Sequence, residues 1–341
     1  MKQPFSKFRV ASAGRRWLRW IGVTIGQRRD VIRTSVFGVS AAVAIVSTSA
    51  AEKVVIGLSQ PNLGWPYIAA YTKAFQEAAA KKGNVDVIAL SGEGDIAKQS
   101  RDMDSLIAKQ VNIILVCSLD GNAIVPSIKA AHDAKIPVLA VSNEPASSAN
   151  DFLAGYSGPD DYVQGKIAAE LLNDALEGKG NIVIIEGTPG QSTTAARTKG
   201  LMDRFAELKS NIQILGKQTA NWDPVQAKTV MEDFLTTYGD KINGVFSQDD
   251  NTAAAAAEVI KAAAKLPAIK VVGTGGSKNG IQAIRDGLVY GTMNQSPSAD
   301  AQQGLEIALG IVAGKAPEQK RTIIPMPKIT AANVSQFQGE W

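Results

Sequence analysis

Two large aromatic side chains stand together in one loop, where they could bind the apolar face of a sugar ring. Trp65 and Tyr67 follow the first apolar run of the chain, in the same loop as the polar residues Gln60 and Asn62. Aromatic rings can stack on the C–H face of a sugar while polar neighbours hydrogen-bond to its hydroxyl groups. The alternative is that both rings cover the core of their own domain.

Further hydrogen-bonding groups follow three later apolar runs. Ser142 and Asn143 end one run, and Arg197 stands in the first turn of a predicted helix, where its guanidinium could bind hydroxyl groups or face solvent. Asp249 and Asp250 follow another run, and at such a point one carboxylate usually contacts a ligand while the other caps the helix. These groups favour a binding site for a hydroxylated small molecule.

A tryptophan and a glycine-rich turn complete this set. Trp222 lies in a loop between a predicted strand and a predicted helix. Gly275 belongs to the segment 273–277, Gly-Thr-Gly-Gly-Ser, whose glycines let another group approach the backbone closely.

Catalysis, metals and cofactors are not expected. The single Cys117 excludes a disulfide within the chain, and one cysteine with one histidine, His132, argues against the usual zinc sites and catalytic triads. The loop 186–197 lacks the Gly-Lys-Ser/Thr that completes a phosphate-binding loop. A glycosidase acting through Asp249 and Asp250 is the enzyme alternative, but adjacent residues rarely flank a scissile bond.

Short apolar runs alternate with helix-like stretches over residues 53–157, and the same rhythm then starts again. Such runs are typical of buried parallel strands joined by crossover helices. We therefore predict an α/β fold with two doubly wound parallel-sheet lobes and a cleft that can close on a ligand. The predicted strands span residues 54–58, 85–90, 113–116, 138–141, 152–155, 182–185, 212–215, 244–246 and 270–273.

The first 51 residues are predicted to be an export signal. They carry nine Lys or Arg residues and one acid, a net charge of +8, whereas the rest of the chain carries −4 and the whole chain +4. The basic pI therefore gives no argument for nucleic-acid binding. The apolar run 36–46 has signal-peptide length, and the small residues after it favour cleavage near Ala50 or Ala51. The pair Arg28-Arg29 leaves the twin-arginine and general secretory routes both open, and a retained membrane anchor is the alternative.

The order of these landmarks resembles the type I periplasmic sugar-binding proteins, in particular the ribose-binding branch. The likeness covers nearly all of residues 53–330. It rests on Trp65-Pro66-Tyr67, Ala195-Ala196-Arg197 with Gly200, Asn221-Trp222-Asp223, Phe246-Ser247-Gln248-Asp249-Asp250, Val271-Val272-Gly273 and Gln295-Ser296-Pro297.

The resemblance implies two similar lobes joined by three crossovers, near Ser157, Gln295 and Pro325. The first lobe would comprise residues 52–157 and 296–325. The second lobe would comprise residues 158–295 and 326–341.

The resemblance also implies ligand contacts, motif by motif. Tyr67 and Ile68 stand where the family has an aromatic pair, and Trp65 replaces a polar contact. Trp222 would be the ring-stacking aromatic of the second lobe. The other implied contacts are Arg197, Asp249 and Gln295.

Two departures from the family pattern argue against ribose as the ligand. Ribose-type members have Asp-Arg where this chain has Ser142-Asn143, and they have an acid where this chain has the glycine-rich turn with Gly275. Without those two carboxylates, ribose would lose hydrogen-bond acceptors for its hydroxyl groups. A polyol, a deoxy sugar or another pentose is expected instead, and a sugar acid stays open if Arg197 lacks a second acid.

The resemblance implies a monomeric periplasmic receptor that delivers a carbohydrate or polyol to the membrane permease subunits of an ABC importer. A chemosensory sugar receptor would share these features. A regulator of the lac repressor family has the same fold but would need an N-terminal helix-turn-helix. Residues 1–51 have aromatics, basic residues and one apolar run instead.

Overall fold

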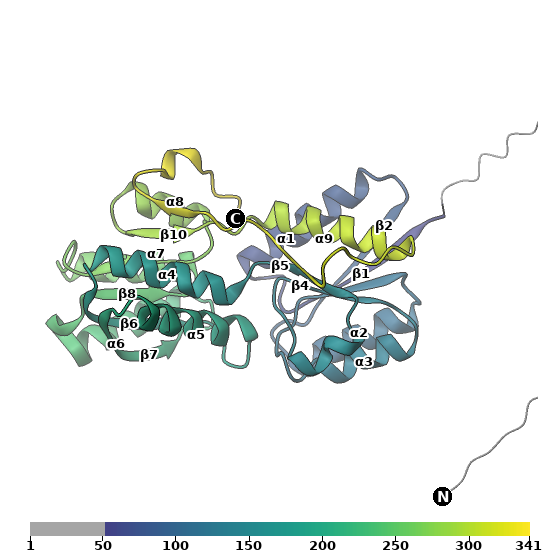
Figure 1. The fold of residues 1–341 in the computed structure, drawn as a ribbon, viewed down its shortest axis with the longest axis horizontal. Helices are drawn as coiled ribbons and strands as arrows, with labels where there is room; N and C mark the ends of the chain where they lie inside the picture. The colour runs from purple at the N-terminus through teal and green to yellow at the C-terminus, as the bar shows by residue number, and fades with distance from the viewer. Residues whose placement is uncertain (1–51) are drawn as a thin grey trace, which may run out of the picture. The chain divides into compact units, whose positions relative to one another are not determined.

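The computed structural model describes residues 52–341 as two six-stranded sheets, each with helices on both faces (Figure 1). The predicted export signal, its cleavage near Ala50 or Ala51 and the anchor alternative lie outside the described residues. Among residues 52–341, no helix is long and apolar enough to cross a bilayer.

The first sheet has the strand order β11-β5-β4-β3-β1-β2, and all its neighbouring strands are parallel. Its strands are β1 (Val54–Gln60), β2 (Val85–Ser91), β3 (Ile113–Val116), β4 (Val138–Val141), β5 (Gly155–Gly158) and β11 (Arg321–Ile323). The helices on one face are α1 (Pro66–Ala80) and α9 (Pro297–Val312), and those on the other are α2 (Ile96–Ala108) and α3 (Val125–Asp133). Because both faces are covered, every residue of β3 and β4 is buried.

The second sheet has the order β12-β10-β9-β8-β6-β7, in which only β12 runs antiparallel to its neighbour. Its strands are β6 (Lys179–Glu186), β7 (Asn211–Thr219), β8 (Gly244–Ser247), β9 (Lys270–Val272), β10 (Gly291–Met293) and β12 (Lys328–Thr330). The helices on one face are α4 (Asp161–Ala175) and α5 (Ser192–Glu207), and those on the other are α6 (Pro224–Tyr238), α7 (Asp250–Ala262) and α8 (Lys278–Arg285). The two-lobe α/β fold predicted from the sequence is confirmed.

The chain passes between the two sheets three times. It leaves the first sheet after β5, returns to it after β10, and crosses again between β11 and β12. The lobe boundaries at residues 157/158, 295/296 and 325/326 stay a prediction.

The fifth strand differs from its predicted position at 152–155. Residues 147–152 form a 3₁₀ segment, and β5 begins at Gly155. The apolar residues Phe152 and Leu153 attracted the prediction, but they pack against the core beside α3. Residues 155–158 form the strand, and they pair with β4 on one side and β11 on the other.

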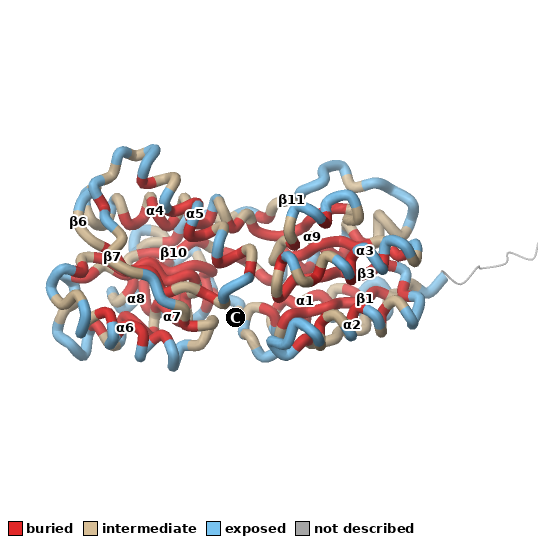
Figure 2. The backbone as a smooth tube through the Cα atoms, turned by 90° about the horizontal axis from the view of Figure 1, so that it is seen from below, coloured by how far each residue is buried: buried red, intermediate tan, exposed pale blue. Residues whose placement is uncertain are grey.

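The buried residues concentrate in the strands and on the inner faces of the helices (Figure 2). Cys117 is buried at the end of β3. The side chain of His132 is 48% exposed on α3, where its ring lies against Phe152. Neither residue lines the cavity between the lobes.

Helices α4 and α5 lie so close that two glycines are needed at their contact. A Cβ atom at Gly165 would lie 2.1 Å from the carbonyl oxygen of Arg197, and one at Gly200 would lie 2.0 Å from that of Tyr162. Both clashes are with backbone, which cannot rotate away. The close contact holds Arg197 of α5 against the start of α4.

We expect Gly200→Ala to lower the free energy of unfolding by about 1–3 kcal/mol, because the added methyl group must push two helices apart. Gly310→Ala is the matched control, since Gly310 also lies within a helix but has open space around its Cα. The control should be neutral or stabilising by roughly 0.5–1 kcal/mol. Urea denaturation measures both, and equal stability of the two variants would contradict the packing argument.

Candidate functional site

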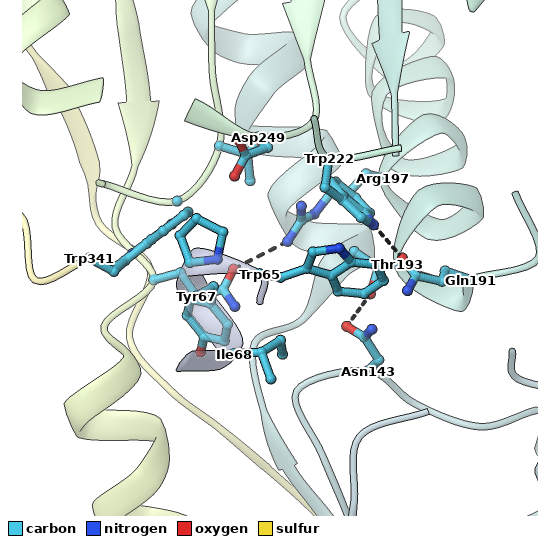
Figure 3. Close-up of a pocket in the computed structure, with 14 residues that line it drawn as sticks. Trp65, Tyr67, Ile68, Asn143, Gln191, Thr193, Arg197, Trp222, Asp249 and Trp341 are labelled. Carbon is cyan, nitrogen blue, oxygen red and sulfur yellow. Dashed lines mark hydrogen bonds between the residues drawn. The ribbon is translucent and has the colours of Figure 1, made fainter. Parts of the chain in front are cut away.

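A cavity lies between the two lobes, and Figure 3 shows the side chains that line it. The empty space within the cavity and its mouth, which is open to solvent, measures about 580 Å³. Its walls come from segments that follow β1, β4, β6, β7, β8, β9 and β10. Open α/β sheets bind their ligands at this carboxyl edge of the strands.

The cavity brings together most of the residues expected from the sequence. Those that line it are Trp65, Tyr67, Ile68, Asn143, Arg197, Trp222, Asp249, Gly275 and Gln295. Five further lining residues were not predicted: Pro66, Gln191, Thr193, Thr274 and Trp341. Pro66 and Thr274 adjoin predicted residues, and Gln191 and Thr193 lie in the segment just before Arg197, whereas Trp341 carries no such signal.

Three expected residues do not line the cavity. Gln60 ends β1 and is fully buried in the first lobe. The Oδ1 atom of Asn62 accepts a hydrogen bond from the backbone N–H of Gly64 at 2.8 Å, which turns the side chain back on its own loop. Ser142 is buried and donates its hydroxyl to Asp300 at 2.8 Å. The structure thus places all three side chains away from the cavity wall, and their role in ligand binding stays a prediction.

The first lobe supplies the aromatic residues at the start of α1. Pro66 occupies the first helical position, where its missing N–H is tolerated, so the helix begins directly after Trp65. The hydroxyl of Tyr67 donates to Asp300 at 2.7 Å. Burial raises the pKa of Tyr67 well above 10.0, so its hydroxyl stays protonated and keeps this bond. The ring of Tyr67 is thereby fixed beside the cavity.

Arg197 is the centre of a buried hydrogen-bond network in the second lobe. Its Nε donates to Gln164 Oε1 at 3.0 Å, its Nη1 to the carbonyl of Gln248 at 2.6 Å, and its Nη2 to Gln295 Oε1 at 3.2 Å. The same Nη2 lies 3.0 Å from Asp161 Oδ1. Arg197 lies in the second turn of α5, not the first. The protein itself uses most of the guanidinium N–H groups that were expected to bind a ligand.

Asp161 can pair with Arg197 because the preceding residue, Asp160, caps helix α4. Asp160 is the N-cap of α4 and accepts the backbone N–H of Val163 at 3.0 Å. Asp161 is buried, and its Oδ2 lies 2.9 Å from Thr193 Oγ1, whose single proton is also within reach of Asn143 Oδ1. Desolvation raises the pKa of Asp161, while the positive charge of Arg197 opposes that rise.

Trp222 lies flat against the backbone of the loop after β6. A Cβ atom at Gly187 would lie 1.9 Å from its Cζ2 atom, so only glycine leaves room for the indole. The indole Nε1 donates to Gln191 Oε1 at 2.7 Å, and the guanidinium of Arg197 lies 5.9 Å from the ring centre. Trp222 is therefore held in one orientation at the cavity wall.

The two adjacent aspartates divide their roles differently from the sequence expectation. The capping residue of α7 is Asp249, which accepts the backbone N–H groups of Asn251 at 2.8 Å and Thr252 at 3.1 Å, and it also lines the cavity. Asp250 is fully buried and accepts the hydroxyl of Thr292 at 2.7 Å. Desolvation raises the pKa of Asp249 to about 6 and that of Asp250 to about 7.

The two lobes touch each other across the cleft. Thr193 of the second lobe donates its hydroxyl to Asn143 Oδ1 of the first at 2.8 Å, and Ser192 donates to the carbonyl of Glu144 at 2.6 Å. The two lobes are therefore in direct contact beside the cavity. No group of three or more metal-ligating side chains is found among residues 52–341.

Residues 56–316 match the family model of the periplasmic binding protein domain. The chain belongs to this periplasmic binding protein family. This membership confirms the resemblance predicted from the sequence, and the family is one of binding proteins rather than enzymes.

Named relatives of this periplasmic binding protein bind sugars or polyols. It is 32% identical over 264 residues to the xylitol-binding protein of Mycolicibacterium smegmatis, covering 77% of this chain and 73% of that protein. It is 30% identical over 260 residues to the ribose import binding protein of Bacillus subtilis, covering 76% and 82%. Among solved structures, an ABC transporter periplasmic solute-binding protein from Actinobacillus succinogenes with bound D-allose is similar at a TM-score of 0.76 and 26% identity, covering 84% of this chain and all of that one.

Proposed function

We propose that this protein is a periplasmic receptor that captures a neutral sugar or polyol between its lobes. The observation that carries the proposal is a cleft with aromatic side chains from both lobes and a buried arginine that already has an acidic partner. Trp65 and Tyr67 come from the first lobe and Trp222 from the second. Aromatic faces suit the C–H groups of such a ligand, and the polar rim suits its hydroxyl groups.

The charge inside the cleft favours a neutral ligand over a sugar acid. Asp161 lies 3.0 Å from Arg197, and Asp249 adds a second carboxylate to the cavity wall. An anionic ligand would meet these carboxylates without an unpaired cation to bind it. A sugar acid was an open alternative only if Arg197 had no second acid beside it. Asp161 is such an acid, so that condition is not met.

The same residues favour a small polyol, deoxy sugar or pentose over ribose. Ser142 is turned toward Asp300, and Asn143 presents an amide to the cleft, so neither supplies the carboxylate of the ribose-type pattern. The xylitol-binding and ribose-binding relatives support a ligand of similar size and polarity. We include Trp65, Tyr67, Ile68, Asn143, Arg197, Trp222, Asp249, Gly275 and Gln295 in the proposed ligand site.

The setting of the receptor is also proposed. A leader cleaved near Ala50 or Ala51 would send the chain to the periplasm, and a monomer would deliver the ligand to the permease subunits of an ABC importer. Turnover of the ligand is not expected, because Asp250 is buried and bonded to Thr292 rather than facing the cavity beside Asp249. Ligand contacts to both lobes would stabilise the closed form.

A thermal-shift and calorimetry screen of residues 52–341 tests the proposal. The panel holds polyols, pentoses, deoxy sugars, hexoses, ribose and sugar acids. A ligand at 1,000 times its Kd should stabilise the protein by about 4 kcal/mol. We expect a response to at least one neutral compound and none to the sugar acids. A folded protein that responds to no compound would falsify the assignment.

The variant Trp222→Ala locates the binding event. Removing the indole should raise the Kd of the ligand found in the screen about tenfold or more. Tenfold corresponds to a loss of about 1.4 kcal/mol of binding free energy. Val225→Ala is the control, because Val225 is 73% exposed at the start of the next helix and does not line the cavity. If both variants bind as the unchanged protein does, the ligand binds elsewhere.

A further inference from the structure

The segment 337–341 is anchored on the second lobe. Phe337 packs against the core of that lobe. A Cβ atom at Gly339 would lie 2.4 Å from the backbone nitrogen of Lys278, so the segment runs directly along the start of α8. The N–H of Lys278 donates to the carbonyl of Trp341 at 2.8 Å.

The same segment reaches the first lobe. The carboxylate of Glu340 accepts the hydroxyl of Ser296 at 2.6 Å and the backbone N–H of Ser298 at 3.1 Å, at the start of α9. A negative charge is favourable at the N-terminus of a helix. The indole of Trp341 meets the ring of Tyr67 edge to face, with ring centres 5.5 Å apart. The end of the chain accordingly lies between the two lobes in both views (Figures 1 and 2).

Gly275 leaves the space that the indole of Trp341 occupies. A Cβ atom at Gly275 would lie 2.5 Å from Cζ2 of Trp341, so any larger residue would displace the ring. The backbone of Gly275 has a φ of 131°, which also favours glycine. Trp341 therefore occupies space beside the turn where the ribose-type pattern has an acid.

Trp341 stands as a wall of the cavity on the side away from Trp222. Figure 3 shows Trp341 and Tyr67 on one side and Trp222 with Thr193 on the other. Among the described residues, the Nε1–H of Trp341 has no hydrogen-bond partner although it is buried. Buried indole N–H groups usually have an acceptor, and an oxygen atom of a bound ligand would supply one.

We propose that Trp341 is a ligand-contacting residue that sets the upper size of the ligand. This inference rests on the proposed function, because it concerns the same cavity. The indole closes one side of the cleft, covers a C–H face of a small polyol or pentose, and excludes larger sugars. Its position depends on Gly275 below it and on the Glu340 contact that holds the segment to the first lobe.

Calorimetry of Trp341→Ala and Trp341→Phe against neutral polyols, pentoses, hexoses and methyl glycosides tests this role. We expect Trp341→Ala to bind the small ligand about tenfold or more weakly, and to shift its preference toward hexoses and methyl glycosides. Trp341→Phe keeps one aromatic ring, so its affinity for the small ligand should lie between that of the unchanged protein and that of Trp341→Ala. Gln338→Ala, an exposed change in the same segment, should bind as the unchanged protein does.

The outcomes separate the two proposals. Should the unchanged protein bind while both folded Trp341 variants keep its affinities and its order of preference, only the role of Trp341 is overturned. If the unchanged protein binds no neutral compound, the proposed function fails and this inference fails with it. Circular dichroism and melting temperature verify folding, and the phenylalanine variant carries the test if the alanine variant unfolds.

Discussion

Arg197→Met is expected to lower the free energy of unfolding by about 3–5 kcal/mol, because it leaves a buried carboxylate without its cation. Arg197 and Asp161 are 6% and 8% exposed, so water cannot replace the lost partner. Methionine preserves much of the length of the side chain, which limits the loss of packing. The change also removes the donors to Gln295 and Gln248, so the second lobe loses bonds between several of its loops.

Urea denaturation of two further variants gives the comparison. Arg204→Met is the matched control on the same helix: its ion pairs with Glu170 and Glu207 are partly solvated, and such pairs contribute about 0–1 kcal/mol each. Asp161→Asn combined with Arg197→Met should recover part of the loss, because the neutral amide needs no cation. An Arg197 variant as stable as the Arg204 variant would contradict the buried-pair argument.

Stability is expected to fall as the pH rises from 5 to 8, and Asp300→Asn should remove a large part of this fall. Asp300 is fully buried, and desolvation raises the pKa of its carboxyl to about 7, although hydrogen bonds from Tyr67 and Ser142 oppose the rise. The negative charge of Asp161 adds to the effect. The difference between this pKa and the ordinary value of 3.8 corresponds to ~4 kcal/mol in the free energy of ionising Asp300.

The direction follows from proton binding. Near pH 5 to 6 the folded protein holds a proton on Asp300, whereas the unfolded chain does not. This contribution is complete below the unfolded pKa of 3.8 and is lost as the pH rises through about 7. Asp250, with its pKa raised to about 7, contributes in the same direction, so some pH dependence should remain in Asp300→Asn.

Urea denaturation at several pH values from 5 to 8 measures this dependence. Asp133→Asn serves as the control, since a hydrogen bond from Lys129 lowers the pKa of Asp133 and this exposed residue stays ionised throughout the range. The argument for Asp300 fails if the asparagine variant keeps the full pH dependence of the unchanged protein.

The fold could be predicted from the sequence because its signals are local. Short apolar runs mark buried strands, and the stretches between them are long enough for crossover helices. The fifth strand was misplaced because its sequence, Gly-Tyr-Ser-Gly, is less apolar than the preceding Phe152 and Leu153. Pairing with β4 and β11, which no local pattern records, decides its position.

The residues that line the cavity were predictable where the end of a strand or a family motif marks them. Trp222, Asp249 and Gln295 follow strands whose ends meet at the cleft. The position of Ser142 away from the cavity wall could not be predicted, because its partner, Asp300, lies 158 residues later in the chain. The place of Trp341 was not predictable either, since it depends on a contact with Gly275 that the sequence does not mark.

The crossing of α9 and β11 back to the first lobe also affects the order in which the protein can fold during synthesis. Helix α9 packs on α1 and contributes Ala301, Leu305 and Ala308 to the same core as Ile56 and Leu58 of β1. The ribosome makes these two parts of one core more than 240 residues apart. The first lobe, although synthesised first, must wait for α9 before its apolar face is covered, so the usual domain-by-domain order does not apply to it.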